Sequence, residues 1–325
     1  MTNTIDAGIF YAEYHGHPVS HLEQLHDRLA KEAETTIWLT GDSSLDNKHW
    51  FFDPYQTKKY QVYSGAASTF IGNAVNGYEK ILRPAHMVKD VAFWMNSIAA
   101  ERYGSGKILT INASIEESTI GERMASTTGL LPHDEFVRDH CRANDVIVLS
   151  VGGNDVALKP TLATIASVFS LTRCPMWLLR RCGSWSPGWS HMENLLHDRI
   201  EEIVQRMTNS PNQTPPKKII VCMIYFLDQQ PGDSWADGTL AALGYNSNPD
   251  KLQLIIRMLF ERINARGFKV KRASTGVMCF PLFEVLDGTD TNDYIQRVEP
   301  SVQGGKKIAN KLLRFIFDQK PQPEK

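Results

Sequence analysis

Five continuous apolar runs, separated by long intervals, constrain the fold of this chain more than any other feature of its sequence. They cover residues 35–41, 107–113, 145–153, 217–226 and 277–286. Continuous rather than alternating runs are typical of strands that are covered on both faces. Helical patterns lie before, between and after them, at residues 21–34, 87–103, 192–207, 250–265 and 305–319. Strands alternating with helices predict an α/β fold, a three-layer α/β/α sandwich around a parallel sheet.

The length of the chain, 325 residues, suits one large α/β domain or two modest ones. The sequence contains no internal repeat and no low-complexity tract. We therefore expect a single domain over residues 1–325. Two connections, at about 42–86 and 156–190, exceed ordinary loop lengths, and we expect them to form elaborated structure.

The charge balance, apolar stretches and cysteine content of the sequence indicate which partners and which cellular location to expect. The chain has 35 Lys and Arg against 36 Asp and Glu, so we expect no nucleic-acid partner. It lacks the pattern of a secretory signal and any stretch of roughly 18 apolar residues that would span a membrane. Its five cysteines are odd in number and widely spaced, which is typical of a reduced protein. We expect a cytoplasmic protein without a metal or an organic cofactor.

Polar residues follow three of the predicted strands at their carboxyl ends. Asp42 and Ser43 follow the first run, Asn112 ends the second, and Gly153 and Asn154 follow the third. In open parallel sheets ligands bind outside these ends, so we expect the residues to meet at one edge. A hydroxyl together with amide donors provides what acyl transfer needs, a nucleophile and a site for an oxyanion.

The segments "GDSSLDN" (41–47) and "VGGNDVAL" (151–158) resemble the first and third blocks of the SGNH, or GDSL, hydrolases. The resemblance implies a flavodoxin-like fold and hydrolysis of a carboxylic ester, an acetyl ester among the candidates. It implies that Ser43 is the nucleophile and that Asn154 donates to the oxyanion, with Asp42 and Gly153 beside them. The implied partner is a small-molecule or acylated substrate. Without this resemblance, Gly-Asp-Ser is also a common turn and helix-start sequence.

The second block of that family departs from its usual form here. "INASIEESTIGER" supplies Asn112, but Glu117 occupies the position expected for a glycine whose backbone N–H joins the oxyanion hole. The backbone N–H of Glu117 remains available as a donor. Its carboxylate would be unfavourable beside a developing oxyanion if the side chain pointed inward.

The last block departs further, because the family's D-x-x-H is replaced by Gln296-Arg297-Val298-Glu299 and no histidine follows His197. One interpretation makes Glu299 the general base, with burial raising its pKa and Gln296 as a neutral neighbour. The other makes Glu299 structural and ionised beside Arg297. The alternative function is therefore a non-catalytic SGNH-fold binding or scaffold protein that lacks the histidine base.

Other residues are weaker candidates. His49 is a fallback base, and His133 and His140 lie on a predicted helix before the third strand. The Trp- and Arg-rich segment 173–189 has three interpretations: a lid over an apolar acyl pocket, a peripheral membrane contact, or a packed subdomain. After the fourth strand, Trp235 and Tyr245 are placed at the same edge by topology alone.

Overall fold

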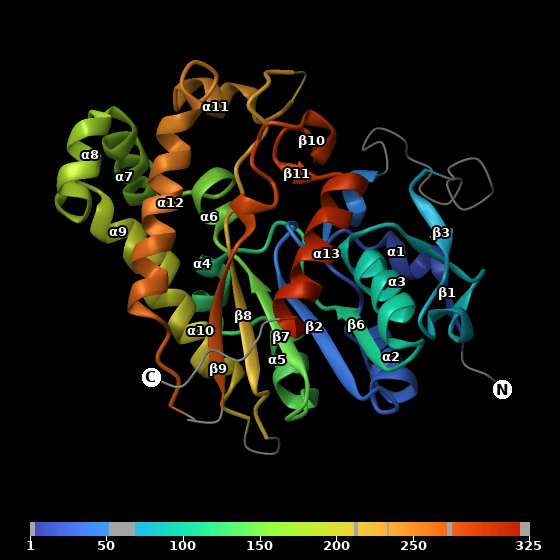
Figure 1. The fold of residues 1–325 in the computed structure, drawn as a ribbon. Coiled ribbons are helices and arrows are strands. Elements are labelled where there is room, and N and C mark those ends of the chain that lie inside the picture. The colour runs from blue at the N-terminus through green and yellow to red at the C-terminus, as the bar shows by residue number, and fades with distance from the viewer. Residues whose placement is uncertain (1–3, 52–68, 211–213, 233, 272–274, 319–325) are drawn as a thin grey trace.

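A five-stranded parallel sheet forms the centre of the computed structural model, which describes residues 4–51, 69–210, 214–232, 234–271 and 275–318 (Figure 1). The strands are β2 (Thr35–Gly41), β6 (Ile108–Asn112), β7 (Val146–Ser150), β8 (Lys218–Met223) and β9 (Gly276–Pro281). Their order in the sheet is β6-β2-β7-β8-β9, and every neighbouring pair is parallel. Numbered along the chain this is the order 2-1-3-4-5, the flavodoxin-like arrangement. The predicted fold class is confirmed.

Each of the five apolar runs overlaps one sheet strand; β9 begins one residue before its run, and several strands end before theirs. The run at 145–153 leaves the sheet after Ser150, because Gly152, with φ of 112°, turns the chain into helix α6 (Gly153–Ala157). The run at 277–286 passes at Leu282 into a 3-10 helix. Apolar side chains continue beyond these strand ends since they still face buried surroundings there.

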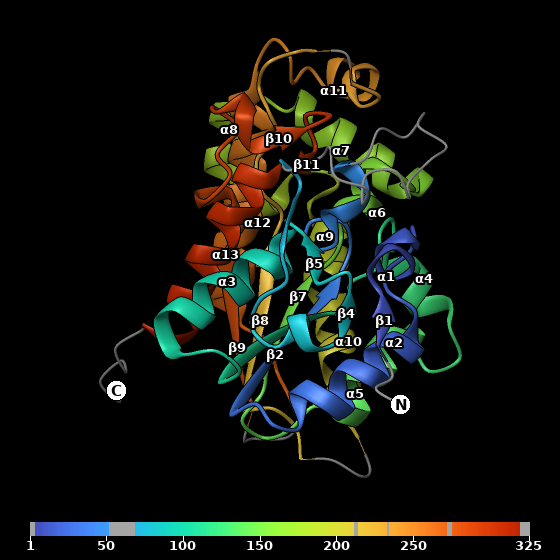
Figure 2. The same ribbon diagram turned by 90° about the vertical axis from the view of Figure 1, so that its right-hand side faces the viewer.

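Helices cover both faces of the sheet (Figure 2). On one face lie α3 (Val91–Tyr103) and α13 (Val302–Phe317), which pack against Ile37 and Leu39 of β2. On the other face, where Trp38 points, lie α2 (Val19–Leu25), α5 (Pro132–His140), α10 (Arg199–Met207) and α12 (Pro249–Arg266). Successive side chains of a strand point to opposite faces, so one short segment supports both layers.

The two long connections contain additional elements. Within 42–86 are a 3-10 helix at Asn47–Phe51 and the short strands β3 (Ile71–Asn73), β4 (Leu82–Arg83) and β5 (His86–Val88), whereas residues 52–68 lie outside the described part. Within 156–190 are α7 (Leu162–Arg173), α8 (Met176–Cys182) and the start of α9 (Trp189–Glu193). The expected elaboration of 156–190 is thus helical. Among the described residues, no helix is both long and apolar enough to cross a membrane.

Candidate active site

Ser43 and Glu299 meet at the carboxyl edge of the sheet although 256 positions separate them in sequence. Ser43 lies in the turn after β2. Glu299 begins the short strand β11 (Glu299–Pro300), which pairs in antiparallel fashion with β10 (Tyr294–Ile295). The Ser43 hydroxyl donates a hydrogen bond to Oε1 of Glu299 at 3.1 Å, and both residues are 6% exposed. The Ser43 hydroxyl thus faces a carboxyl group at the distance that proton transfer between them requires.

The turn that carries Ser43 depends on Gly41. Its φ is 126°, and a Cβ at this position would lie 1.7 Å from the carbonyl oxygen of Ser150 on β7. A residue with a side chain therefore cannot occupy the position without displacing a central strand. Asp42 secures the same turn, because its Oδ1 accepts the backbone N–H of Ser44 at 3.1 Å and the Ser44 hydroxyl at 2.6 Å. Asp42 lines the cavity beside Ser43, but its carboxylate is engaged in holding the turn.

Two hydrogen bonds hold the chain on either side of Glu299. The Tyr225 hydroxyl, which follows β8, donates to the carbonyl oxygen of Val298 at 2.5 Å. The Asn47 side chain donates to the carbonyl oxygen of Pro300 at 2.9 Å. Sequence reasoning missed Tyr225, since nothing in its local pattern indicates which distant segment it contacts. Together they fix the backbone from which the Glu299 side chain reaches Ser43.

The electrostatic surroundings of Glu299 favour its neutral form. Burial raises the pKa of this carboxyl to about 8, and the negative charges of Asp42 and Glu117 act in the same direction. The hydrogen bond from Ser43 acts in the opposite direction, because it stabilises the carboxylate. Within the described residues, Oε2 of Glu299 has no hydrogen-bond partner. Once ionised, Glu299 is therefore a much stronger base than an exposed glutamate.

Arg297 and Gln296 both turn away from Glu299. They adopt left-handed backbone conformations, with φ of 65° and 51°. The Arg297 guanidinium pairs with the Asp237 carboxylate at 2.6 Å and donates to the carbonyl oxygen of Asp228 at 3.0 Å. The Gln296 amide oxygen accepts the backbone N–H of Trp235 at 3.2 Å. The basic neighbour that could have held Glu299 ionised is thus committed elsewhere, and Gln296 does not line the cavity.

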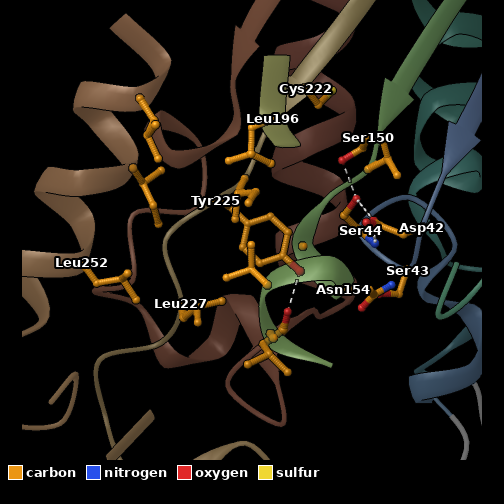
Figure 3. A pocket seen from close by; sticks show the side chains of 18 of the residues that line it. Asp42, Ser43, Ser44, Ser150, Asn154, Leu196, Cys222, Tyr225, Leu227 and Leu252 are labelled. Carbon is orange, nitrogen blue, oxygen red and sulfur yellow. Dashed lines mark hydrogen bonds between the residues drawn. The ribbon is translucent and has the colours of Figure 1, made fainter. Parts of the chain in front are cut away.

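Asn154, in the first turn of α6, lines the same cavity as Ser43 (Figure 3), and so does Gly153. Its amide nitrogen donates to the carbonyl oxygen of Ser118 at 3.0 Å. That nitrogen carries two hydrogens, so one remains for a ligand. Among the described residues, no acceptor is bound to the backbone N–H of Ser43. Both N–H groups are therefore available to a ligand.

Asn112 and Glu117 support the site from outside the cavity. The Asn112 amide nitrogen donates to the carbonyl oxygen of Leu45 at 3.1 Å, and its amide oxygen accepts the Ser114 N–H at 3.0 Å. It therefore holds the turn after Ser43. Glu117 has φ of 58°, the left-handed conformation that glycine adopts most readily, and its carboxylate accepts the Tyr14 hydroxyl at 2.7 Å. Neither side chain lines the cavity.

The three candidate histidines make other contacts. The His49 ring packs edge-on against Tyr14 with centroids 4.2 Å apart. Nε2 of His133 is 2.7 Å from the carbonyl oxygen of His17, and Nδ1 of His140 is 2.8 Å from that of Phe136. The hydrogen bond of the Ser43 hydroxyl goes to a carboxylate rather than to any of these rings.

A second buried carboxylate, Glu116, lies in the electrostatic field of Glu299. Trp50 donates its ring N–H to Oε1 of Glu116 at 2.7 Å, while Oε2 has no partner among the described residues. Burial and the charge of Glu299 raise the pKa of Glu116 well above its usual value. Sequence reasoning missed this residue, although it directly precedes Glu117 in the second block. Two buried carboxyls that repel each other's charge make the neutral form of each more stable.

The cavity that contains Ser43 and Glu299 has a volume of about 1070 Å³, its open mouth included. Its polar groups gather at the sheet edge, whereas most of the rest of its wall is aliphatic (Figure 3). Side chains from α7, α9, α12 and the π-helix that follows α9 form that wall, among them Val168, Leu171, Met192, Leu196, Ile255 and Leu259. Trp235 lines the cavity as expected, whereas Tyr245 is buried outside it. Within the described part of the chain, no group of His, Cys, Asp or Glu is placed to hold a metal ion.

Comparisons with known proteins give only distant likenesses. No family model matches the sequence, and no curated protein matches it. An acetylxylan esterase from Geobacillus stearothermophilus is 14% identical with a TM-score of 0.43, over 91% of this chain and 100% of that one. An α/β hydrolase from the metagenome of Lake Arreo is 15% identical (TM-score 0.40, 86% and 94% covered). A carbohydrate esterase family 3 structure from Talaromyces cellulolyticus is 14% identical (TM-score 0.35, 88% and 100% covered). At these TM-scores the likenesses add nothing to the site geometry described above.

Proposed function

We propose that this protein hydrolyses carboxylic esters through Ser43, with Glu299 as the general base. The observation that carries the proposal is the 3.1 Å hydrogen bond from the Ser43 hydroxyl to a buried carboxylate at the polar end of an aliphatic cavity. The resemblance of "GDSSLDN" and "VGGNDVAL" to blocks of SGNH hydrolases supports the same assignment.

In the proposed acylation step, the oxygen of Ser43 attacks the ester carbonyl while its proton moves to Oε1 of Glu299. The negative charge that develops on the carbonyl oxygen is stabilised by the backbone N–H of Ser43 and the free amide hydrogen of Asn154. Glu299 then returns its proton to the departing alkoxide, which leaves as an alcohol. An acyl group remains on Ser43.

In deacylation, water takes the place of the alcohol. Glu299 accepts a proton from the water as its oxygen attacks the acyl carbonyl, and the same donors stabilise the second oxyanion. The intermediate collapses when Ser43 departs and regains the proton from Glu299. The carboxylic acid leaves, and the enzyme returns to its starting state.

A carboxylate base explains why this site needs no counterpart to the family's Asp-His pair. Histidine becomes a cation when it accepts a proton, and an aspartate stabilises that cation. Glu299 becomes neutral instead, and burial favours its neutral form. A glutamine at 296 whose side chain points elsewhere is consistent with this chemistry. The raised pKa of Glu299, about 8, compensates for the weak basicity of an ordinary carboxylate.

The cavity wall favours esters of apolar acids that are longer than acetate. Its wall takes aliphatic side chains from α7, α9 and α12, which offer far more apolar contact than the two carbon atoms of an acetyl group can use. Val168, Leu171, Ile255 and Leu259 offer an acyl chain aliphatic contacts and no hydrogen bonds. Burial of each methylene of such a chain contributes about 0.8 kcal/mol.

The decisive experiment is labelling by a fluorophosphonate above pH 8, where Glu299 is ionised, followed by mass-spectrometric location of the adduct. We expect an adduct on Ser43 and none in Ser43→Ala. Ser44→Ala is the matched control, because Ser44 also lines the cavity but donates to Asp42 and Ser150 rather than to Glu299. It should still be labelled.

Turnover of 4-nitrophenyl acetate, butyrate and octanoate completes the test. We expect the butyrate and octanoate esters to be hydrolysed faster than the acetate ester. Absence of both labelling and turnover refutes the proposal. If octanoate then raised the melting temperature of wild type and Ser43→Ala equally, the protein would be a binding module with this cavity as its ligand site.

A further inference from the structure

Helix α7 is apolar on two opposite sides, and one of them faces solvent. Val168 and Leu171 point inward and line the cavity. Leu162, Ile165 and Phe169, which recur at helical spacing, are 86%, 50% and 45% exposed. A helix on the surface of a globular protein normally carries polar residues on its outer side. The outer side of α7 therefore lacks a partner within the described structure.

Two exposed tryptophans follow α7 in the next segment of the chain. Trp177, on α8, is 67% exposed, and Trp185, in the 3-10 helix after it, is 89% exposed. Helices α7 and α8 lie together at one extremity of the molecule, away from α3 and α13 (Figure 1). Exposed tryptophan is unusual in a soluble surface but is enriched where proteins meet the headgroup region of a bilayer. Trp189, in contrast, is buried and belongs to the core.

The charge of the same region has one sign. Between residues 156 and 192 the sequence contains Lys159, Arg173, Arg180 and Arg181 and no Asp or Glu. Lys159 pairs with Glu122 at 2.9 Å, so the three arginines carry the net charge of this segment. The three arginines are exposed. The Arg173 guanidinium lies 3.7 Å above the Phe169 ring, so charge and apolar surface are presented together. Basic residues beside exposed aromatic and aliphatic side chains are the composition of segments that lie in an anionic membrane interface.

We propose that α7 and α8 form a surface that binds anionic lipid bilayers, with α7 between the bilayer and the cavity. Lipid headgroups would neutralise the arginines while Leu162, Ile165, Trp177 and Trp185 enter the interface. A second copy of this chain fits less well, because a two-fold interface would bring this basic surface against itself. Under the proposed function, on which this last step rests, the substrates are esters of membrane-borne amphiphiles that reach the cavity beneath α7.

Co-sedimentation with vesicles tests the surface without any catalytic step. We expect binding to vesicles of equal parts phosphatidylcholine and phosphatidylglycerol, weaker binding to phosphatidylcholine alone, and release at high salt. Ile165→Ser should lower the partition coefficient at least about fivefold. Ile9→Ser is the matched control, since Ile9 on α1 (Ala7–Ala12) is 53% exposed on an element remote from α7. It should leave binding unchanged.

Two substitutions that remove positive charge provide a second test of the proposed surface. Replacing Arg180 and Arg181 by Gln should lower binding to anionic vesicles by about thirtyfold at low salt, about fivefold for each residue. Lys311→Gln with Arg314→Gln, exposed positions of α13 on the other face of the sheet, is the control and should have a much smaller effect. Vesicles should also shift the tryptophan emission of the wild type to shorter wavelength, and less so in Trp177→Leu with Trp185→Leu.

Three outcomes overturn the proposal: no binding to anionic vesicles, equal losses in Ile165→Ser and Ile9→Ser, or self-association in solution that Ile165→Ser abolishes. The last would assign the surface to a second copy of the chain. Thermal unfolding of each variant verifies that it is folded. Fluorophosphonate labelling of Ser43 is measured separately, in the absence of vesicles, so that the two proposals can be tested independently. Labelling without vesicle binding refutes the membrane surface alone, and vesicle binding without labelling refutes the hydrolase alone.

Discussion

The substitution Glu299→Gln removes the basicity of this side chain and keeps its shape. The amide oxygen of glutamine can still accept the Ser43 hydroxyl at the position that is 3.1 Å away in the wild type. It cannot take up the proton of Ser43. A general base contributes about 10²- to 10⁴-fold to the rate, so we expect kcat for ester hydrolysis to fall by that factor. KM should change little, because the cavity wall that holds the acyl chain is unaltered.

The pH dependence of the wild type identifies the group. With the pKa of Glu299 at about 8, roughly a tenth of the molecules carry the ionised base at pH 7. We expect kcat/KM to rise about tenfold per pH unit up to pH 8 and then to level off. Steady-state kinetics on 4-nitrophenyl butyrate, corrected for spontaneous hydrolysis, measures this profile. A wild-type rate that is flat between pH 6 and 9, or a limb near pH 8 that persists in Glu299→Gln, would refute our assignment of the base.

The same burial gives stability the opposite dependence on pH. Folding raises the pKa of Glu299 from 4.5 to about 8, so the folded protein holds a proton that the unfolded chain releases between these values. The contribution to stability is complete below pH 4.5 and is lost as the pH rises through 8. This pKa change corresponds to about 5 kcal/mol, or about 7 °C in melting temperature for a chain of this length. Glutamine has no such proton to lose.

Calorimetric melting of wild type and Glu299→Gln at pH 6 and pH 9 therefore separates two roles of the residue. The variant should lose less stability than the wild type over this interval, because it lacks the proton of Glu299 and also the charge that helps to raise the pKa of Glu116. If both proteins lost the same melting temperature, Glu299 would be ionised at neutral pH and the catalytic interpretation would lose its basis.

Three further predictions concern the oxyanion site, the turn and the cavity. Asn154→Ala should lower kcat about 10²- to 10³-fold with little change in KM, which steady-state kinetics would detect. Gly41→Ala should abolish stable folding, because the new Cβ would lie 1.7 Å from the Ser150 carbonyl oxygen, whereas Gly106→Ala, with φ of 80° and no atom within 4 Å, should cost about 1 to 2 kcal/mol. Urea unfolding compares the two. Ile256→Trp fills part of the cavity from α12 and should reduce turnover of octanoyl esters more than that of acetyl esters; equal losses would place the acyl group elsewhere.

Much of the fold was predictable because its signals are local. Residues 35–41 were expected as a strand and form β2 with the same bounds. The alternation of runs and helical patterns predicted a parallel sheet, and the carboxyl-end rule placed Ser43 and Asn154 at one edge. The segment 156–190 was harder to interpret, because α7 is apolar on both its inner and its outer side. Hydrophobic periodicity orients a helix when one side is apolar and the other is polar. It does not predict which side is buried when both sides are apolar.

The sequence by itself determined the strands, their sheet type and the turn that carries Ser43, because each depends on the conformational preferences and apolar spacing of neighbouring residues. Only the tertiary structure decided which side chain accepts the hydrogen bond of the Ser43 hydroxyl. Glu299 could be aligned with the base, but its contact with Ser43 and its pKa depend on distant segments that exclude water around it and turn Arg297 toward Asp237. Desolvation and charge interactions act through space, and a chain of residues specifies them only once it has folded.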